Sequence, residues 1–226
     1  MPSTRPLTSP IRLLDGVEPF SVPVTETGIV AACGRVGDHS LSLLPDERVG
    51  LERMADVRRA EYSSGRRVAR EALALLGIEN CGVTARGRVP IWPPGIVGSI
   101  THSRELAMAM VGRDASVAGI GVDVEQEHRV DARVAARVLV PKERARLVEE
   151  DWQTMLFAAK EAVYKAVSPL VGEYLEFADV EVSASRNGTF SAVTTRPRES
   201  TARIETGQGH FLRVEGHWLC VFLVPN

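Results

Sequence analysis

One short stretch near the middle of the chain, Gly119 to Glu125, constrains the fold more than any other. It reads Gly-Ile-Gly-Val-Asp-Val-Glu, and β-branched residues between glycines are typical of a buried strand. Because side chains alternate along a strand, Asp123 and Glu125 project from the same face, roughly 7 Å apart at the backbone. Two anions side by side at the end of an apolar strand repel each other and lose hydration, so they need a cation or shared protons. An ordinary solvated strand end is the alternative interpretation.

The ligands at this strand end favour one kind of cation. Cys33, Cys81 and Cys220 are far apart, and no Cys or His residues cluster with metal-ligand spacing. Hard carboxylate oxygens favour Mg²⁺, which keeps bound waters and takes its remaining ligands from a phosphate group. The odd number and wide scatter of the cysteines also indicate a reducing compartment and no disulfide framework.

A second phrase is marked by its lysines. The chain has 24 arginines but only three lysines, and two of these lie in the short helical phrase Lys160 to Lys165, which reads Lys-Glu-Ala-Val-Tyr-Lys. An ammonium differs from a guanidinium in shape, hydration and acidity, so its retention here indicates a site. The alternative is a solvated ion pair between Glu161 and Lys165, four residues apart, worth a few tenths of a kcal/mol.

A third phrase, Gly98 to Ser103, reads Gly-Ser-Ile-Thr-His-Ser and ends a short predicted strand that begins at Ile96. Its hydroxyls, its backbone N–H groups and the imidazole of His102 could receive an anion. Taken alone, it is equally well explained as a hydrogen-bonded turn.

Length and composition limit the classes of protein. With 226 residues and a mass of 24.6 kDa, the chain can bury a substantial core as one domain or two small halves. A net charge of −2 and an isoelectric point near 6.2 give no global electrostatic case for nucleic acid binding. The N-terminus has no apolar signal core, and no run of about 18 apolar residues occurs, so we expect a cytoplasmic protein that does not bind a membrane.

Glycine, proline and polar clusters divide the chain into expected elements. We expect a strand, a helical region ended by Gly77, a hairpin, a second helix with Asp151 as N-cap and Ser168-Pro169 as its stop, and then antiparallel strands. The expected ranges are 28–33 for the first strand, 46–76 for the helical region, 106–111 and 117–125 for the hairpin, 151–167 for the second helix, and 177–183, 189–194, 211–215 and 218–224 for the later strands. These elements predict an α+β fold.

In this order and spacing, the three phrases resemble the 4′-phosphopantetheinyl transferases of the surfactin- and siderophore-synthetase-activating, broad-acceptance type. Those enzymes carry a Ser/Thr-His-Ser/Cys loop, a Gly-Ile/Val-Asp-x-Glu strand and a Trp/Phe-x-x-Lys-Glu-Ala/Ser-x-x-Lys helix. Here the helix begins its motif at Phe157, and the resemblance extends upstream to 58–62, 66–70 and 90–93, so it covers roughly residues 55 to 170. It implies two similar α/β halves related by a pseudo-two-fold axis, with the substrate between them. We place the boundary near residue 117, with an N-terminal half of 1–116 and a C-terminal half of 117–226.

The resemblance also implies a reaction. Coenzyme A would donate its phosphopantetheine arm to a serine of an apo acyl or peptidyl carrier protein, and 3′,5′-ADP would leave. Asp123, Glu125 and Glu161 would hold Mg²⁺ against the pyrophosphate. The base would be Glu161, or a water held by Glu125 or by the metal, and Lys165 would neutralise or protonate the leaving phosphate.

Coenzyme A needs further cationic groups for its phosphates. The resemblance implies that Lys160 and His102 bind phosphate oxygens, with Thr101 beside them. The 3′-phosphate would be bound by basic residues upstream, and the candidates are Arg58, Arg66, Arg70 and Arg86. Helix geometry favours Arg59 over Arg58 as the neighbour of Arg66, so this choice stays open, and a solvated helix face is the alternative for the whole cluster.

The partner would be an acidic helical carrier protein. The segment Val138 to Leu147 carries Lys142, Arg144 and Arg146 among apolar residues, and we expect carriers to dock there; an amphipathic surface helix is the alternative. We expect a monomer. Competing functions are a protein that binds coenzyme A or a carrier without turnover, and a Mg²⁺-dependent phosphohydrolase that uses the same carboxylates on water. The sequence does not tell which carrier or pathway is served.

Overall fold

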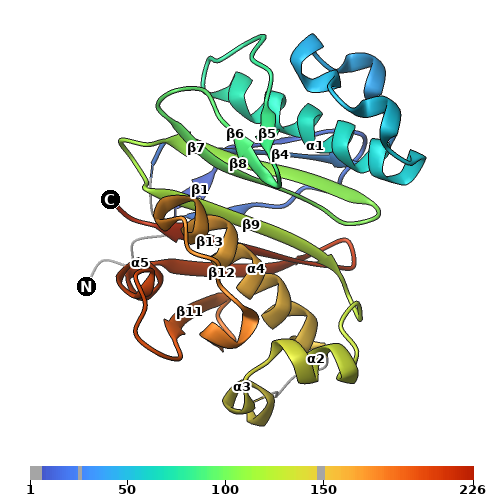
Figure 1. The fold of residues 1–226 in the computed structure, drawn as a ribbon. Coiled ribbons are helices and arrows are strands. Elements are labelled where there is room, and N and C mark those ends of the chain that lie inside the picture. Colours follow the sequence, from blue (N-terminus) through green and yellow to red (C-terminus); the bar gives the residue numbers. More distant parts are fainter. Residues whose placement is uncertain (1–6, 25–26, 147–150) are drawn as a thin grey trace.

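Two sheets, each covered by one long helix, organise the computed structural model of the chain, which describes residues 7–24, 27–146 and 151–226 (Figure 1). Within these residues, the first sheet has the spatial order β2 (Ile11–Leu13), β4 (Ile29–Arg35), β8 (Leu106–Arg113) and β7 (Ile96–His102). The second has the order β10 (Val180–Ser185), β11 (Thr189–Thr194), β12 (Gln208–Val214), β13 (His217–Val224) and β9 (Gly119–Gln126). Two short ribbons pair β1 (Leu7–Ser9) with β3 (Val22–Val24), and β5 (Thr84–Arg86) with β6 (Val89–Ile91). The predicted α+β class is confirmed.

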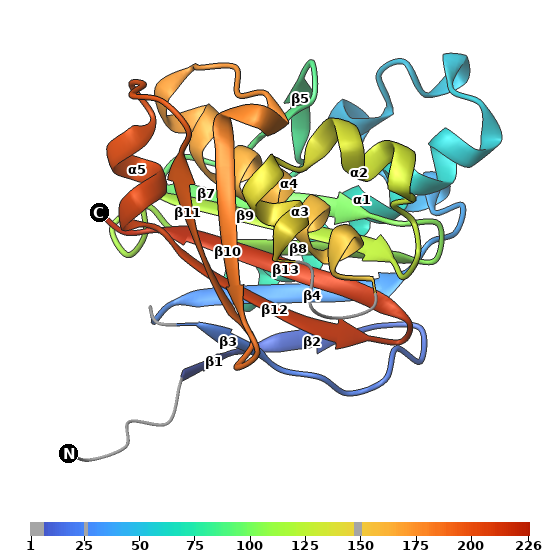
Figure 2. The same cartoon turned by 90° about the horizontal axis from the view of Figure 1, so that it is seen from below.

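Helices cover one side of the sheets, away from β1 and β3 (Figure 2). Helix α1 (Asp56–Leu75) packs on the first sheet and α4 (Trp152–Val171) on the second. The shorter helical elements are η1 (Ser40–Ser42), η2 (Pro45–Arg48), η3 (Leu51–Arg53), α2 (Ala132–Val138), α3 (Pro141–Ala145), η4 (Phe177–Asp179) and α5 (Thr201–Thr206). None of the helices in the described ranges has the length and apolar character needed to cross a membrane.

Strand alternation explains how three cores form. On β8, Ala107 and Ala109 face α1, whereas Met108 and Met110 face a central core that also contains residues of β3 and β13. The small alanines allow α1 to lie close to the sheet, and the methionines fill the irregular space on the other side. The third core lies between α4 and the second sheet.

The two sheets meet where β7 runs beside β9, and side chains connect them. The Ser99 hydroxyl accepts a hydrogen bond from the backbone N–H of Val122 at 3.1 Å, and the Thr101 hydroxyl accepts one from Val124 at 3.2 Å. These alternate polar residues of β7 therefore satisfy backbone donors of β9 that have no strand partner on that edge. This contact fixes the third sequence phrase against the first.

A second set of contacts joins the halves at the start of β13, further along the same row. The buried His217 ring lies 3.1 Å from the Ser103 hydroxyl, with its other nitrogen 2.9 Å from the Glu215 carbonyl. The Glu215 carboxylate accepts from the backbone N–H of Glu18 at 2.6 Å and pairs with Arg35 at 2.5 Å. These bonds fix the position of the first sheet relative to the second.

Several sequence expectations about elements were wrong. The predicted hairpin does not form, because β8 pairs with β4 and β7, while β9 crosses to pair with β13. The predicted helical region begins with η2 and η3 instead of one helix, and Gly50 adopts a left-handed φ of 80° between them. Helix α4 continues through Ser168-Pro169 and ends at Val171, with Gly172 as its C-cap residue. Asp151 is the N-cap residue of α4, as predicted, but its side chain does not bond the backbone of the first turn; it accepts from the Trp218 indole at 3.0 Å.

Candidate active site

The strand β9 presents its carboxylates to α4 because of its glycines. Ile120, Val122 and Val124 point into the central core, so the alternate positions face α4. A Cβ atom on Gly121 would lie only 1.8 Å from the Ala162 carbonyl oxygen, so only glycine lets the helix backbone approach this closely. Two residues further along the same face is Asp123, beside the turn of α4 that carries Glu161 and Lys165.

Asp123 is the centre of the cluster and is only 4% exposed. Its Oδ1 accepts from the Thr101 hydroxyl at 3.0 Å and from the Lys165 ammonium at 2.5 Å. The same ammonium donates to the Val122 carbonyl at 3.2 Å. The other oxygen, Oδ2, is buried and has no hydrogen-bond partner among the described residues. A buried carboxylate with one unsatisfied oxygen is an acceptor that a cation or donor can still occupy.

The two neighbouring glutamates are also perturbed. Burial, reinforced by the nearby Asp123 charge, raises the pKa of Glu125 to about 7. Burial and Asp123 likewise raise the pKa of Glu161, while Lys165 and Arg88 partly oppose the shift. Lys165, Arg88 and Arg129 lower these pKa values in part, but burial and the mutual repulsion of the carboxylates outweigh them. Perturbation by burial together with named charge partners is typical of functional sites.

The donor set fits a hard divalent cation. In the side-chain arrangement of the described residues, no three carboxylate, imidazole or thiolate groups are assembled as a metal site, and Lys165 supplies the positive charge at Asp123. The unsatisfied Oδ2 of Asp123 and the neighbouring carboxylates of Glu125 and Glu161 are oxygen donors of the kind that a hard divalent cation takes. The residues present therefore fit the Mg²⁺ ligands expected from the sequence.

The Thr-His loop contributes two different groups. Thr101 is 3% exposed, and its hydroxyl is used between Asp123 and the Val124 amide, so it orients the carboxylate. The His102 Nε2 lies 3.1 Å from Arg58 Nη1 and 3.9 Å from Glu61. Burial lowers the pKa of His102, which favours the neutral imidazole, although Glu61 acts in the opposite direction.

The predicted arginines fall into separate environments. Arg58 is exposed beside His102 and pairs with Glu61 at 3.3 Å, whereas the Arg59 guanidinium pairs with Asp38 and Asp56. Arg66 is 7% exposed, and its guanidinium lies 4.6 Å from the Tyr62 ring centre.

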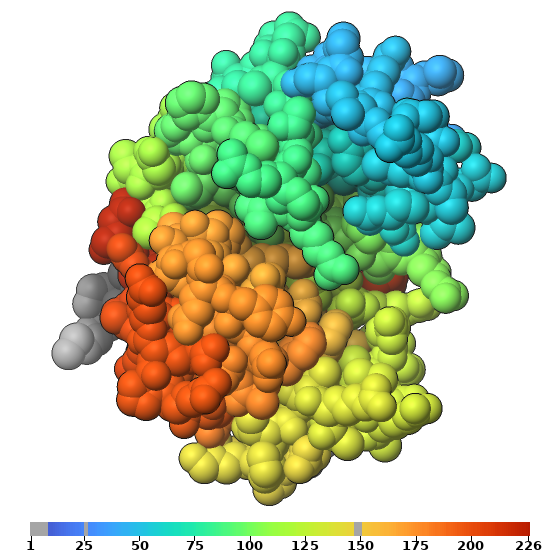
Figure 3. All heavy atoms as spheres, viewed as in Figure 1, coloured from blue at the N-terminus to red at the C-terminus, as the bar shows by residue number. Residues whose placement is uncertain are grey.

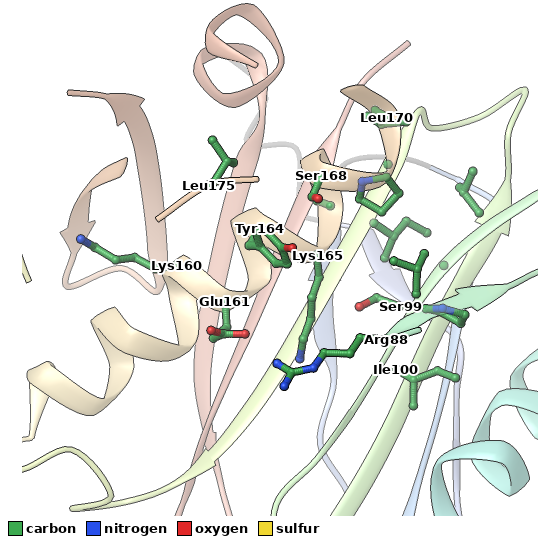
Figure 4. A pocket seen from close by; sticks show the side chains of 18 of the residues that line it. Arg88, Ser99, Ile100, Lys160, Glu161, Tyr164, Lys165, Ser168, Leu170 and Leu175 are labelled. Carbon is green, nitrogen blue, oxygen red and sulfur yellow. The ribbon is translucent and has the colours of Figure 1, made fainter. Parts of the chain in front are cut away.

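Two predicted phosphate ligands lie outside the cluster. Arg70 is paired with the buried Glu47 and donates to the Ser42 carbonyl at 2.9 Å. Lys160 is 3% exposed, and its ammonium points away from Glu161 (Figure 4). The structure therefore does not bring Arg70 or Lys160 to the three carboxylates.

A cavity of about 430 Å³ opens beside the cluster. Its walls come from β7 and the β5–β6 ribbon on one side, and from α4 and the loop after it on the other. In the space-filling view, the green segment that contains the β5–β6 ribbon and β7 lies directly against the orange segment that contains α4 (Figure 3). The lining is largely apolar and includes Trp92, Ile96, Tyr164, Leu175 and Phe177.

Sequence reasoning missed Arg88. It lies at the turn between β5 and β6, and its guanidinium reaches toward Glu161 and Lys165 (Figure 4). Arg86, which was predicted, is exposed and lines an outer hollow that adjoins the cavity and shares Val89 and Tyr164 with it. The sequence signal for Arg88 is the phrase Arg86-Gly87-Arg88. Gly87 adopts a left-handed φ of 63° at this turn, and the two arginines line different hollows.

The expected docking segment contains one structural arginine. Lys142 and Arg146 have side chains 71% and 61% exposed and both approach Glu181, at 3.2 and 3.5 Å. Arg144 instead donates to the carbonyls of Ala136 and Leu139, so it holds its own turn. The end of the predicted segment, at 147, lies outside the described residues.

Comparisons with known proteins agree with these features. Residues 45–112 match the sequence model of the 4′-phosphopantetheinyl transferase N-terminal domain, and residues 119–221 match that of the 4′-phosphopantetheinyl transferase superfamily. The 4′-phosphopantetheinyl transferase Svp of Streptomyces mobaraensis is 35% identical over 202 residues, which cover 80% of this chain and 82% of Svp. PptT of Mycobacterium tuberculosis is 34% identical over 155 residues (66% and 68%), and Npt of Nocardia iowensis is 32% identical over 188 residues (77% and 83%). A solved structure of Thermotoga maritima holo-[acyl-carrier-protein] synthase matches with a TM-score of 0.39 and 21% identity, over 49% of this chain and 64% of that one.

Proposed function

This chain belongs to the 4′-phosphopantetheinyl transferase superfamily, and we propose that the cluster between β9 and α4 is where it carries out the transfer. The chain transfers the 4′-phosphopantetheine arm of coenzyme A to carrier proteins. The observation that carries the proposed location is the convergence of Lys165 and Asp123 with two glutamates of raised pKa, Glu125 and Glu161, at the edge of an apolar cavity.

The reaction is a displacement at the β-phosphorus of coenzyme A. The oxygen of the carrier serine forms a bond to that phosphorus, and the bond from the phosphorus to the bridging oxygen of the pyrophosphate breaks. The product 3′,5′-ADP leaves with the electron pair, and the serine proton passes to a base. Since charge spreads over the phosphoryl oxygens, positioning and electrostatic stabilisation supply most of the catalysis.

Asp123, Glu125 and Glu161 would hold Mg²⁺. The unsatisfied buried Oδ2 of Asp123 supports this assignment, because it leaves an acceptor for a cation in a site already rich in negative charge. When bound, Mg²⁺ would neutralise charge on the pyrophosphate oxygens.

The base is Glu161, or a water held by Glu125. A carboxylate in water is too weak a base to take a serine proton efficiently at neutral pH, and burial that raises its pKa improves the match. Both glutamates have raised pKa values, Glu125 to about 7.

Lys165 would neutralise or protonate the leaving phosphate. Its ammonium already lies in the cluster, 2.5 Å from Asp123, on a flexible side chain that is 26% exposed. When a phosphate with multiple charges enters, the ammonium can exchange one anionic partner for another without leaving the site.

The cavity of about 430 Å³ would receive the pantetheine arm. Its apolar lining suits a chain with few charges, and Arg88 lies at the end where the pyrophosphate would join it. His102 and Arg58, which contact each other, would contact phosphate oxygens, and the buried Arg66 beside Tyr62 would add a further positive charge. Arg86, in the outer hollow, would take part in binding the 3′-phosphate.

The carrier would approach through Lys142 and Arg146 of α3 and the turn after it. Both side chains are exposed and share one acidic neighbour, so an acidic helix can compete for them. We also propose that the protein acts as a monomer in the cytoplasm.

The test is a transfer reaction read by the intact mass of the carrier. The purified protein is incubated with Mg²⁺, coenzyme A and a panel of apo carrier domains, with Glu161→Gln as the control. We expect the carrier to gain the mass of one phosphopantetheine with the wild type and not with the variant. Release of free phosphopantetheine with no gain on any carrier would indicate hydrolysis, and binding of coenzyme A with neither product would indicate a binding protein.

A further inference from the structure

The same six-residue turn occurs once in each half of the chain. Residues 43–48 read Leu-Leu-Pro-Asp-Glu-Arg and residues 139–144 read Leu-Val-Pro-Lys-Glu-Arg. In each, proline opens a short helix, η2 or α3, and the glutamate two positions later accepts from the backbone N–H of the residue before proline. The arginine that ends each turn, Arg48 or Arg144, donates to the carbonyl of its first residue, at 2.9 Å in both cases.

The glutamates of these turns are buried and have matching partners. Glu47 is fully buried and accepts from the amides of Leu44 and Val83, at 3.0 Å each. Glu143 is 2% exposed and accepts from Val140 and Val182, at 2.7 Å each. In both halves, the carboxylate therefore connects its own turn to the chain that follows the long helix.

Each buried carboxylate meets one cation from the long helix. Glu47 pairs with Arg70 of α1, and Glu143 pairs with Lys160 of α4 at 2.8 Å. Each cation also donates at 2.9 Å to the carbonyl two residues before the turn's N-cap, that of Ser42 or Val138. The helices read Ala-Arg-Glu-Ala-Leu over 69–73 and Ala-Lys-Glu-Ala-Val over 159–163, so the cations occupy equivalent places.

The Lys160 ammonium has no donor left for a substrate. It donates to the carbonyls of Val138 and Phe177, at 2.9 and 2.8 Å, and pairs with Glu143. An ammonium has three donors. Moving it to a phosphate would leave the Glu143 carboxylate buried without a cation, which is strongly unfavourable. Burial lowers the pKa of Lys160, with Glu143 opposing this shift, as expected for an ammonium enclosed by protein.

We propose that Lys160 is a positioning residue that clamps α3 and the cavity wall at Phe177 against α4, as Arg70 clamps η2 against α1, and that its ammonium does not bind coenzyme A. This inference rests on the proposed function, since the two clamped parts are the proposed carrier-docking turn and the proposed pantetheine wall. Phe177 stacks on Phe157 of α4 with 5.3 Å between ring centres, so losing the clamp frees this wall next to Glu161.

The test separates a clamp from a phosphate ligand by using two ligands, 3′,5′-ADP and coenzyme A, in calorimetry with Mg²⁺. The product 3′,5′-ADP carries phosphates but no pantetheine arm. For Lys160→Met, we expect the Kd of 3′,5′-ADP to stay within about twofold, because this product lacks the pantetheine arm that the Phe177 wall would contact. We expect coenzyme A to bind more weakly and the KM for the carrier to rise, because both the wall and the docking turn loosen.

Hydrogen exchange of backbone amides measures the stability of the clamp itself, independently of enzyme activity. In Lys160→Met, the amides of Val140 and Val182 should exchange faster, because their acceptor Glu143 loses its cation. Glu143→Gln should give the same exchange pattern, and the double variant should show less than the sum of the two single effects. Arg70→Met is the matched control in the other half, and it should accelerate exchange at Val83 and not at Val182.

The outcomes distinguish failure of the clamp from failure of the proposed function. Loss of 3′,5′-ADP affinity by about tenfold or more in Lys160→Met, with exchange at Val182 unchanged, would overturn the clamp, because losing a hydrogen bond to a charged group has that size. If Lys160→Met does not fold, Glu143→Gln alone decides: normal exchange at Val182 overturns the proposal. Wild-type protein that binds neither ligand would refute the proposed function instead.

Discussion

Gly121 is the residue at which one added carbon should separate the two parts of the active site. A Cβ atom at this position would lie 1.8 Å from the carbonyl oxygen of Ala162 and 2.8 Å from the backbone nitrogen of Ala166. These are backbone atoms of α4, so no side chain can rotate out of the way. Since ordinary contact begins near 3.4 Å, Gly121→Ala should move α4 away from β9 by roughly 1.6 Å, the difference between 3.4 and 1.8 Å.

The displacement acts on stability and catalysis together. Overpacking of this kind costs about 1–3 kcal/mol, and about 2–4 °C of Tm is lost per kcal/mol in a chain of this size. Because Asp123 and Glu125 lie on β9 and Glu161 and Lys165 on α4, the same shift pulls the catalytic groups apart. Misplacement by about 1 Å costs about 10²-fold in rate, so we expect kcat to fall by at least about that factor.

The assay compares kcat for carrier modification and Tm across two variants. Gly119→Ala is the matched control on the same strand face, where the added carbon would lie 2.4 Å from the Ala166 carbonyl oxygen, at a point further from the carboxylates. We expect Gly119→Ala to lose less activity than Gly121→Ala. If Gly121→Ala keeps wild-type kcat and Tm, the close packing of α4 on β9 does not set the geometry of the site, and the reasoning is refuted.

Four further variants test other parts of the account. Lys165→Met should lower kcat by about 10²-fold or more in steady-state kinetics, because the leaving phosphate loses its cation, and an unchanged kcat would remove Lys165 from the chemistry. Arg88→Ala should weaken coenzyme A binding by about tenfold in calorimetry, the size expected for a lost charged hydrogen bond; unaltered affinity would separate Arg88 from the ligand. The double variant Lys142→Glu and Arg146→Glu should raise the KM for the carrier with coenzyme A affinity intact, and a constant KM would refute docking at α3. A backbone N–H donor and a guanidinium hold the pKa of Glu215 below its usual 4.5, so its contribution to stability is complete above that pH and is lost as pH falls through the lower folded value. The stability deficit of Glu215→Gln should therefore be largest near pH 7 and shrink in acid, and a deficit independent of pH would contradict this.

The parts of the site that follow from strand and helix periodicity could be predicted from the sequence. Alternation along Gly119 to Glu125 put Asp123 and Glu125 on one face, and the structure turns that face toward α4. Glu161 and Lys165, one helical turn apart, both reach the cluster. Periodicity within an element is local, so it survives whatever the tertiary arrangement is.

The strand pairing and the burial of individual charges depend on contacts between residues far apart in the sequence, and these features could not be predicted. Residues 106–111 and 117–125 look like a hairpin because they are close in sequence, yet β9 pairs with β13 almost a hundred residues later. Lys160 and Lys165 share one helical phrase, but the burial of each ammonium is decided by distant carboxylates, Glu143 and Asp123. A positive charge in a motif therefore does not tell whether it faces a ligand or a buried anion.

One missed signal was present in the sequence. Comparing the two halves at Leu43 and Leu139 would have shown the repeated Leu-x-Pro-x-Glu-Arg turn, and it would have paired Arg70 with Lys160 as equivalent cations. The match between the two long helices alone is too short to reveal this. The repeated turn reveals the equivalence of the two halves, because its proline, glutamate and arginine each make a separate structural contribution there.

A crystal structure with coenzyme A and Mn²⁺ in place of Mg²⁺ is the most direct test of the account. We predict that the anomalous signal will place Mn²⁺ beside Asp123, Glu125, Glu161 and a pyrophosphate oxygen. We expect the pantetheine arm to lie in the cavity beside α4, and Lys160 to remain paired with Glu143. A metal and pyrophosphate bound away from these three carboxylates would contradict the central claim that β9 and α4 together form the active site.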